Sequence, residues 1–396
     1  MTIRKLDILP LSEWALFDER PLKVIAGPCS AETPQQVLQT AGELKAHGVG
    51  VYRAGIWKPR TYPGSFEGVG EEGLEWLCQA RKEHGVRIIT EVASAKHVAH
   101  CLEAGVDLIW IGARTTASPF LVQEIADALE GADIPVLVKN PVSPDLDLWV
   151  GALERLNRAG VRKLGVIHRG FTTFEKKQYR NDPQWQVAIE LRSMFPQLPF
   201  FVDPSHIAGR RELVREVAQR SLDLGFDGLM IESHCNPDAA LSDADQQLTP
   251  AQLGDMLAHR LKVRNADSDS PQWRENIDQL RAQIDIIDET ILSALSARME
   301  VSRQIGQYKK DNNIAILQTS RWDAVLAKVV EKGRECGLSE KFVTALFNTI
   351  HEESVESQNR IISDPSSSQK VNRVTGHDHS HLLYPCWGDK IIYKKK

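Results

Sequence analysis

Hydrophobic residues in the first two thirds of the chain gather in short runs that end on a polar or charged residue. The runs are rich in Val, Ile and Leu and do not alternate with polar positions, which is typical of strands buried on both faces of a parallel sheet. Helical patterns separate most of the runs, so the chain repeats a βα unit. The eight runs are VIAGPCS (24–30), GVYRAG (50–55), RIITEV (87–92), LIWIGAR (108–114), VLVKN (136–140), LGVIHRG (164–170), FFVDPS (200–205) and GLMIES (228–233).

Eight successive βα units predict a TIM barrel, the (β/α)8 fold of about 250 residues. We assign this barrel to residues 1–262. Because catalytic groups of such barrels lie at the carboxyl ends of the strands, the pattern also predicts the active site. The reactive residues at these ends are Cys29, Arg53, Glu91, Arg114, Lys139, His168, Arg169, Asp203, His206 and Glu232.

The rest of the chain has a different pattern. Residues 263–275 are polar and contain Pro271, as expected of a linker. Residues 276–363 show apolar positions at helical spacing and no strand pattern, which predicts an all-α domain of three helices. Residues 364–396 have no coherent period and predict a disordered tail, in which HDHSH is a weak candidate for metal binding.

Composition narrows the class of protein. The chain is 42% hydrophobic and 26% charged, an ordinary soluble composition, and its formal charge of −5 gives no support for binding nucleic acid or an anionic membrane. Six scattered cysteines without a CxxC motif, and an N-terminus without a secretory apolar stretch, favour the reducing cytoplasm. No run approaches the roughly 18 apolar residues of a membrane span.

Four residues form a candidate metal site. Cys29, His206 and Glu232 follow strands that closure of the barrel brings together, and Asp243 lies in the loop after the last strand. A thiolate, an imidazole and two carboxylates suit a divalent transition metal such as Mn, Fe, Co or Zn. The alternative is structural: a small core cysteine, a histidine at a helix start and two solvated acids.

A second group at the same end is cationic. Several like charges around one mouth repel one another unless an anionic ligand neutralises them, so the group predicts a multiply charged phosphate substrate. Any one of these residues alone would be interpreted as part of a surface salt bridge. The six cations are Arg53, Lys58, Arg60, Arg114, Lys139 and Arg169.

The motifs around these residues occur in order, each at a predicted strand end. They are RAGIWKPRTYPGSFEGVG, IGART, VKNP, HRGF, VDPSHIAG and IESHCNPDAALSDADQQ. Over residues 20–262 this series resembles type I 3-deoxy-D-arabino-heptulosonate 7-phosphate (DAHP) synthase, in its shorter beta branch. The related synthase of the eight-carbon KDO 8-phosphate is the nearest alternative, and the KPRT motif favours the four-carbon sugar substrate.

The resemblance implies a role for each matching position. Cys29, His206, Glu232 and Asp243 would hold one divalent ion per barrel, with Mn²⁺ the first candidate and Fe²⁺, Co²⁺ or Zn²⁺ the alternatives. Arg53, Arg114, Thr115, Lys139 and Arg169 fall in the motifs that hold phosphoenolpyruvate, and Lys58, Arg60 and Thr61 in the motif that holds erythrose 4-phosphate.

The family reaction is an aldol-like condensation with attack of water and loss of phosphate. We expect the metal to polarise the aldehyde and the cations to stabilise the anionic groups. Lys58 is the candidate for handling the proton of the new alkoxide, Lys139 is a candidate point charge or proton donor, and Glu91 is a candidate for orienting the water.

Basic residues also mark the helical region. Arg281 and Arg298 are seventeen residues apart, or roughly 25 Å along a continuous helix, so they cannot share one small ligand. Arg298 and Lys309 fall on nearly the same face, about 16 Å apart, and can converge on a ligand between them. From the charges alone, a solvated dimerisation helix is the favoured interpretation.

Residues 276–362 resemble the all-helical chorismate mutase family, through LRAQIDIIDETILSALSARMEVSRQIGQYKK, TSRWD and HEESVESQ. The resemblance implies rearrangement of chorismate to prephenate, which needs cations and hydrogen-bond donors but no nucleophile. Arg281 would come from a partner chain in a homodimer or larger homo-oligomer. The chain departs from the family at Trp322, where an acidic residue is common. The matching site residues are Arg281, Arg298, Lys309, Arg321, Ser354 and Gln358.

Together the two resemblances predict a bifunctional enzyme of aromatic amino acid biosynthesis, with phosphoenolpyruvate, erythrose 4-phosphate and chorismate as substrates. Such a fusion suggests that prephenate or chorismate, bound by the mutase region, inhibits the synthase. The alternative is a catalytically silent mutase-like region that only regulates and dimerises.

Overall fold

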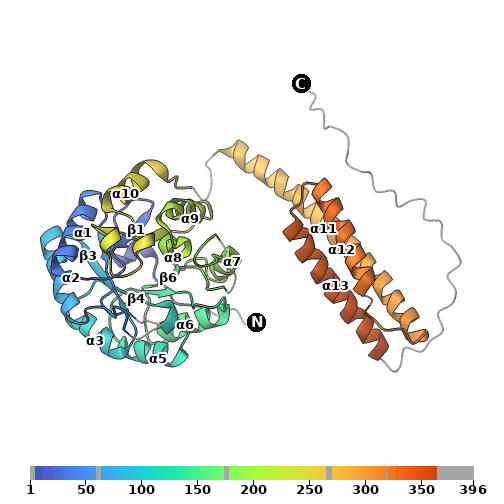
Figure 1. Cartoon of the computed structure of the whole chain (residues 1–396), viewed down its shortest axis with the longest axis horizontal. Helices are drawn as coiled ribbons and strands as arrows, with labels where there is room; N and C mark the ends of the chain where they lie inside the picture. The colour runs from blue at the N-terminus through green and yellow to red at the C-terminus, as the bar shows by residue number, and fades with distance from the viewer. Residues whose placement is uncertain (1–4, 59–63, 174–177, 265–269, 318, 364–396) are drawn as a thin grey trace, which may run out of the picture. The chain divides into compact units, whose positions relative to one another are not determined.

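The computed structural model describes residues 5–58, 64–173, 178–264, 270–317 and 319–363. The chain divides into two compact units, Met1–Asp267 and Ser268–Lys396 (Figure 1). Among the described residues, no helix is long and apolar enough to cross a membrane. The predicted tail and its HDHSH run lie outside the described residues.

The first unit is the predicted barrel. Eight parallel strands pair in sequence order, and β1 pairs with β8 to close the ring. The buried apolar runs form strands because both faces of the sheet are covered, one by the barrel interior and the other by helices. The strands are β1 Lys23–Gly27, β2 Val51–Arg53, β3 Arg87–Val92, β4 Leu108–Ile111, β5 Val136–Lys139, β6 Leu164–His168, β7 Phe200–Val202 and β8 Gly228–Glu232.

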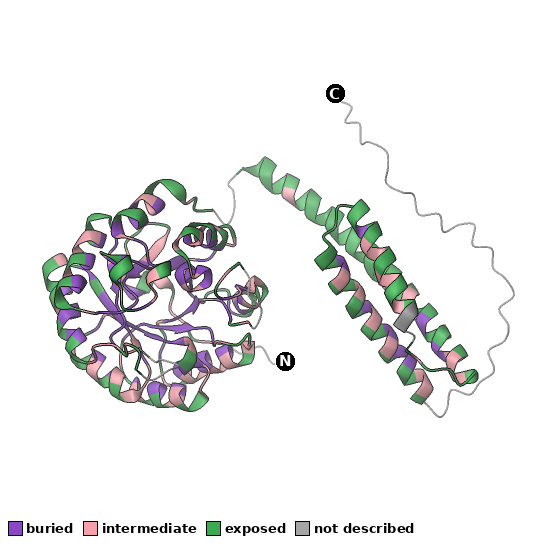
Figure 2. Cartoon of the chain, in the orientation of Figure 1, coloured by how far each residue is buried: buried purple, intermediate pink, exposed green. Residues whose placement is uncertain are grey.

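Helices surround the sheet, and their inner faces are buried while their outer faces are exposed (Figure 2). Side-chain caps start many of them; Thr33, Ser94 and Asp145, for example, each accept a hydrogen bond from a backbone N–H of the first turn. The helices are α1 Pro34–Ala46, α2 Glu72–His84, α3 Ala95–Glu103, α4 Ala113–Thr116, α5 Pro119–Ala128, α6 Leu146–Arg158, α7 Trp185–Met194, α8 Pro204–Ala208, α9 Arg211–Asp223 and α10 Pro250–Asp255.

The barrel interior forms its own apolar cluster, separate from the layer between strands and helices. Ile25, Trp110, Ile167 and Phe201 are among its buried side chains, and Trp14 from the 3₁₀ helix Leu11–Trp14 packs against them. This packing fills the barrel as a solid core, so a ligand can enter only at its ends.

The second unit contains α11 Pro271–Asp311, α12 Thr319–Glu335 and α13 Glu340–Ser363, the three helices that the sequence predicts. The helix α11 begins five residues earlier than expected. Pro271 does not interrupt a linker; it occupies the first helical turn, where its missing N–H costs nothing, and Ser270 caps the backbone N–H of Trp273. The expected linker 263–275 is therefore too long at its C-terminal end.

The two halves of α11 differ in burial. The C-terminal half packs against α13. Gln358 of α13 lies so close to Gly306 that a Cβ added at position 306 would be 3.0 Å from the Cγ of Gln358. In the N-terminal half, Leu280, Ile284 and Ile287 lie on one face and are each more than half exposed. In this unit taken alone, an apolar stripe is therefore left uncovered.

His168 differs from the sequence expectation. It ends β6, but its ring points into the layer between strand and helices, where Trp185 lies 5.4 Å away between ring centroids, and it does not line the pocket described below. Its Nε2 lies 2.6 Å from the carbonyl of Pro183. Because side chains alternate along a strand, the last residue of a strand can face either side. Burial lowers the pKa of His168 to about 4.

This burial predicts a pH dependence of stability. Because the unfolded chain binds the His168 proton near pH 6.5 and the folded chain only near pH 4, stability is complete above pH 6.5 and falls by roughly 3 kcal/mol towards pH 4. We expect urea unfolding of the barrel, followed by tryptophan fluorescence, to show this loss. His168→Asn should flatten the curve between these two pH values, and an equally steep curve in the variant would contradict the assignment.

Candidate active sites

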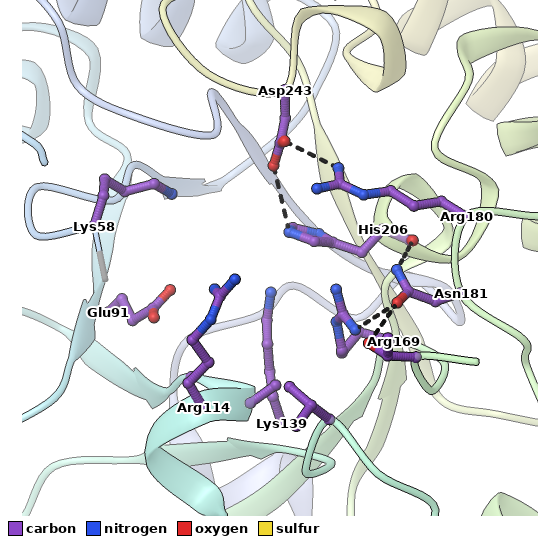
Figure 3. Close-up of a pocket in the computed structure, with 13 residues that line it drawn as sticks. Lys58, Glu91, Arg114, Lys139, Arg169, Arg180, Asn181, His206 and Asp243 are labelled. Atoms are coloured by element: carbon purple, nitrogen blue, oxygen red, sulfur yellow. Dashed lines mark hydrogen bonds and ion pairs between the residues drawn. The ribbon is translucent and has the colours of Figure 1, made fainter. Parts of the chain in front are cut away.

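A pocket of about 280 Å³ opens at the carboxyl ends of the barrel strands (Figure 3). Basic side chains dominate its walls, and Glu91 and Asp243 are the only acidic residues among the described residues that line it. The lining residues are Lys58, Glu91, Gly112, Ala113, Arg114, Lys139, Val142, Arg169, Thr172, Arg180, Asn181, His206 and Asp243.

The four predicted metal ligands, which we call the candidate metal group, lie beside this pocket: His206 and Asp243 line it, and Cys29 and Glu232 are buried next to them. Ligand atoms of Cys29, Glu232 and Asp243 all lie within 4.8 Å of one another. Oδ2 of Asp243 lies 3.4 Å from Cys29 Sγ and 3.8 Å from His206 Nε2. The fold thus gathers one thiol, one imidazole and two carboxylates, a donor set that suits a divalent transition metal.

A buried carboxylate beneath the group orients the histidine. Asp203 follows β7 and caps α8: its Oδ1 accepts from the backbone N–H of His206, and its Oδ2 lies 2.7 Å from Nδ1 of the same residue. Lys139 Nζ also lies 2.9 Å from Asp203 Oδ2. Asp203 therefore fixes the imidazole so that Nε2 faces Asp243, the arrangement by which carboxylates commonly orient metal-binding histidines.

Burial and nearby charges together set the protonation of the candidate metal group. Burial, aided by the charge of Glu232, raises the pKa of the Cys29 thiol to about 12. Burial also lowers the pKa of His206, which favours the neutral imidazole. Although burial opposes it, the cations around Asp243 hold the pKa of that carboxyl well below its usual range. A metal ion would thus find the carboxylate and imidazole ready and would displace the thiol proton.

Lys58 lies beside the metal group. Its Nζ donates to the carbonyl oxygen of Cys29 at 2.8 Å and lies 3.1 Å from the Sγ atom. Burial favours the neutral amine, but the nearby negative groups outweigh this effect and raise the pKa of Lys58. The ammonium group therefore stays charged between the metal group and the pocket.

A fully buried arginine lies next to the metal group, outside the residues that line the pocket. Arg53 places its guanidinium carbon 5.0 Å from the ring centroid of Trp110, and its Nη2 lies 3.2 Å from Glu232 Oε1. Its Nε and Nη1 have no hydrogen-bond partner among the described residues. Nη1 forms an ion pair with Asp203 Oδ2 at 4.0 Å, which is too long for a hydrogen bond, so these buried donors of a cation can still serve an anionic ligand.

Glu91, the next-to-last residue of β3, lies on the opposite wall. Its Oε2 accepts a hydrogen bond from Trp110 Nε1 at 3.0 Å. Gly112 leaves the space that Glu91 needs, because a Cβ there would lie 2.1 Å from Glu91 Oε1. The carboxylate is thus held at the pocket wall, across the cavity from the metal group (Figure 3).

The second unit has a pocket of about 360 Å³ between its three helices. Nη1 of Arg298 donates to Ser354 Oγ at 2.6 Å, and Lys309 Nζ donates to Gln358 Oε1 at 3.1 Å. The lining residues are Arg298, Val301, Ser302, Ile305, Lys309, Ile316, Arg321, Trp322, Val325, His351, Ser354, Val355 and Gln358.

Trp322 forms part of the wall of this pocket. Its ring stacks on His351 at 3.9 Å between centroids and 9° between planes. None of the described lining residues is acidic. An aromatic pair thus occupies a wall of the pocket, and Trp322 brings no carboxylate to it.

Comparisons with known proteins agree with this geometry. Residues 15–266 match the DAHP synthetase I family. The chain belongs to this family. Residues 280–359 match chorismate mutase type II, so a DAHP synthase domain is fused to a chorismate mutase domain, both of them enzymes.

Relatives of the DAHP synthase domain include enzymes for two sugar acids. The phospho-2-dehydro-3-deoxyheptonate aldolase of Thermotoga maritima is 34% identical over 243 residues, which cover 61% of this chain and 70% of the relative. Its crystal structure has a TM-score of 0.54 and covers 60% of this chain and 67% of that one. The 2-dehydro-3-deoxyphosphooctonate aldolase of Desulfotalea psychrophila is 28% identical over 271 residues, which cover 62% of this chain and 91% of the relative.

The DAHP synthase pocket brings together most of the predicted site residues. Lys58, Glu91, Arg114, Lys139 and Arg169 line it, and Arg53 lies buried beneath. Thr115 is buried in α4 and does not line the pocket, while Arg60 and Thr61 lie outside the described residues.

In the chorismate mutase domain the pocket gathers five of the six predicted residues. The exception is Arg281, which is exposed and pairs with Asp278 at 3.4 Å. The role of Arg281 in a site of a partner chain stays a prediction.

Sequence reasoning missed four residues of the DAHP synthase site. Arg180 and Asn181 come from the loop between β6 and α7, and Gln246 comes from a 3₁₀ helix after β8. They do not lie at the carboxyl ends of strands, where we expected the site residues. Trp110, inside β4, was assigned only to an apolar run. The consecutive polar residues in RNDP and DADQQ were the only signal available.

Proposed function

We propose that the barrel condenses phosphoenolpyruvate with erythrose 4-phosphate to form DAHP and phosphate, and that the helical domain rearranges chorismate to prephenate. One observation carries the first part: four of the six predicted cations line a single pocket beside the candidate metal group. Both substrates are phosphate esters, and such a pocket stabilises their negative charge.

The cations divide between two tasks. Lys139 and Arg169 line the pocket, and Arg53 is buried beside Glu232. These three residues would hold the carboxylate and phosphate of phosphoenolpyruvate. Burial lowers the pKa of Arg169 to about 10, so it remains charged at neutral pH. Arg114 would complete this anion site from α4. Lys58, with Arg60 and Thr61 of the same motif, would hold the sugar phosphate.

The candidate metal group would hold one divalent ion, with Mn²⁺ the first candidate. The ion would act as a Lewis acid on the aldehyde oxygen of the sugar phosphate. Lys58, charged and 3.1 Å from Cys29 Sγ, is placed to give a proton to the oxygen that becomes an alkoxide. Glu91, at the opposite wall, would orient the water that attacks phosphoenolpyruvate. The thiol of Cys29 requires reducing conditions, and all described cysteines are free, which supports a cytoplasmic location.

The assay that tests this function combines phosphoenolpyruvate with a sugar phosphate and measures phosphate release. We expect turnover with erythrose 4-phosphate that stops when a chelator is added and returns with Mn²⁺. Turnover with a five-carbon sugar phosphate in its place would instead support synthesis of the eight-carbon acid. Undiminished turnover in the chelator would refute the metal role.

In the helical domain, Arg298 and Lys309 supply the cations that a dianion such as chorismate requires. The rearrangement is pericyclic, so stabilisation of the substrate's charges and of its ether oxygen is sufficient. Lys309 and Gln358 are hydrogen-bonded to each other and would face the ether oxygen. Trp322 removes the usual acidic contact with the substrate hydroxyl, and we expect modest efficiency.

We also propose that α11 mediates a homodimer. Its uncovered stripe of Leu280, Ile284 and Ile287 offers an apolar surface to a second copy, and the adjacent Arg281 would enter that copy's site. Ile287→Asp should convert a dimer of the full chain into a monomer, measured by light scattering. Ala282→Asp, on the opposite face of α11, is the control and should remain dimeric. An unchanged mass for both variants would count against this interface.

Prephenate bound in the mutase pocket would inhibit the condensation. This proposal rests on the fusion itself, which places a binding site for a later product on the same chain as the synthase. Arg298→Ala in the full chain should weaken prephenate inhibition of phosphate release by at least about tenfold, within the usual range of allosteric coupling. Equal inhibition of the wild type and the variant would place the effector elsewhere.

A further inference from the structure

Each carboxylate of the candidate metal group has one oxygen held by a side chain that follows β6 or β8. Oδ2 of Asp243 faces Cys29 and His206, while Oδ1 accepts from Arg180 Nη1 at 2.9 Å. Oε2 of Glu232 accepts from Gln246 Nε2 at 2.6 Å, while Oε1 accepts from Arg53 Nη2 at 3.2 Å and lies 3.8 Å from His206 Nδ1.

The two holding side chains are bonded to each other. Nη1 of Arg180 also donates to Gln246 Oε1 at 2.8 Å, so an unbroken chain of hydrogen bonds runs from Asp243 through Arg180 and Gln246 to Glu232. Gln246 is 1% exposed, and both the oxygen and the nitrogen of its side-chain amide form hydrogen bonds. Its donor end can only meet Glu232 and its acceptor end Arg180, because the reverse orientation would face a donor with a donor.

The backbone around Arg180 fixes this bridge in place. The N–H of Arg180 donates to the carbonyl of Ala208, at the end of α8, the helix that carries His206. Gly209 has a φ of +68° and lets Arg180 pack closely against the backbone. A Cβ at position 209 would lie 2.3 Å from the Cβ of Arg180. Arg180 is half exposed in the pocket and reaches Asp243 across its edge (Figure 3).

We propose that Gln246 and Arg180 are positioning residues for the divalent ion. They keep one oxygen of each carboxylate directed at the ion and prevent either carboxylate from rotating away. The inference rests on the proposed function, in which the candidate metal group holds the ion. Partners of this kind typically change metal affinity by about 10- to 100-fold.

The test measures Mn²⁺ binding to the full chain by competition with a chelating indicator, and the absorption of the Co²⁺-loaded protein, which reports the thiolate bond to Cys29. Gln246→Met keeps the volume and removes the amide, and we expect its dissociation constant to rise about 10- to 100-fold. Arg180→Lys keeps the positive charge but removes the guanidinium group that donates to both Asp243 and Gln246, and we expect a smaller rise of the dissociation constant. Gln39→Met, which removes only an exposed hydrogen bond to Glu43, is the control.

The outcomes separate this inference from the proposed function. If the wild type binds no Mn²⁺, the proposed metal site is wrong. If the wild type binds and both variants bind equally well, with unchanged Co²⁺ spectra, Gln246 and Arg180 only join two loops and the inference is overturned. Should Gln246→Met fail to fold, Arg180→Lys, at a half-exposed position, decides alone.

Discussion

Replacing Cys29 with alanine is expected to abolish metal-dependent condensation. Cys29 supplies the only sulfur of the candidate metal group, and its loss leaves one imidazole and two carboxylates. Lewis-acid assistance contributes several kcal/mol of transition-state stabilisation, so phosphate release should fall by roughly a thousandfold or more. The measurement is the rate of phosphate release with saturating Mn²⁺.

Cys101→Ala provides the matched control for this experiment. Cys101 lies in α3, is fully buried and, like Cys29, has a thiol whose pKa burial raises to about 12. The two substitutions therefore remove the same buried group, one inside the metal group and the other outside the pocket. We expect Cys101→Ala to retain Mn²⁺-dependent turnover; if Cys29→Ala retained it too, the metal assignment would fail.

Arg298→Ala is expected to lower chorismate mutase activity by about a hundred- to a thousandfold, the effect of removing one donor from a preorganised anion site. Arg298 is half-buried, contacts Ser354 and lines the pocket with Lys309. Loss of chorismate absorbance measures the rate. Phosphate release in the absence of prephenate should stay near the wild-type rate, because the variant residue belongs to the other domain.

Arg303→Ala is the control on the same helix. Arg303 is exposed and pairs with Glu300, and it does not line the pocket. If the wild type consumes chorismate and only Arg298→Ala loses this activity, the domain is a working mutase. A wild type that does not consume chorismate would support the alternative of a silent region that regulates and dimerises.

The sequence predicted the barrel well because its strands are buried on both faces. The run RIITEV coincides with β3, Arg87–Val92, and the predicted ends of the strands locate the pocket. The candidate metal group was predictable for the same reason: three of its members follow strands that neighbour one another after closure. Parallel topology converts position along the chain into position in space.

Side-chain direction and loop geometry were not predictable in this way. His168 and Lys139 both end strands, yet one faces the helices and the other the pocket, and only the register of the closed barrel decides between them. Arg180 reaches the metal group from a loop and Gln246 from a short 3₁₀ helix, and neither segment has a sequence periodicity that predicts side-chain direction. Pro271 shows a further limit, since the same residue can interrupt a helix or begin one.

A divalent ion and a set of cations are proposed to meet at one pocket of the barrel. Crystals of the full chain with Mn²⁺ and phosphoenolpyruvate, measured at the manganese absorption edge, would locate both ligands. We expect a single strong anomalous peak per barrel, bonded to Cys29, His206, Glu232 and Asp243, with phosphoenolpyruvate bound beside Lys139 and Arg169. A peak elsewhere, or the ligand bound away from these cations, would contradict it.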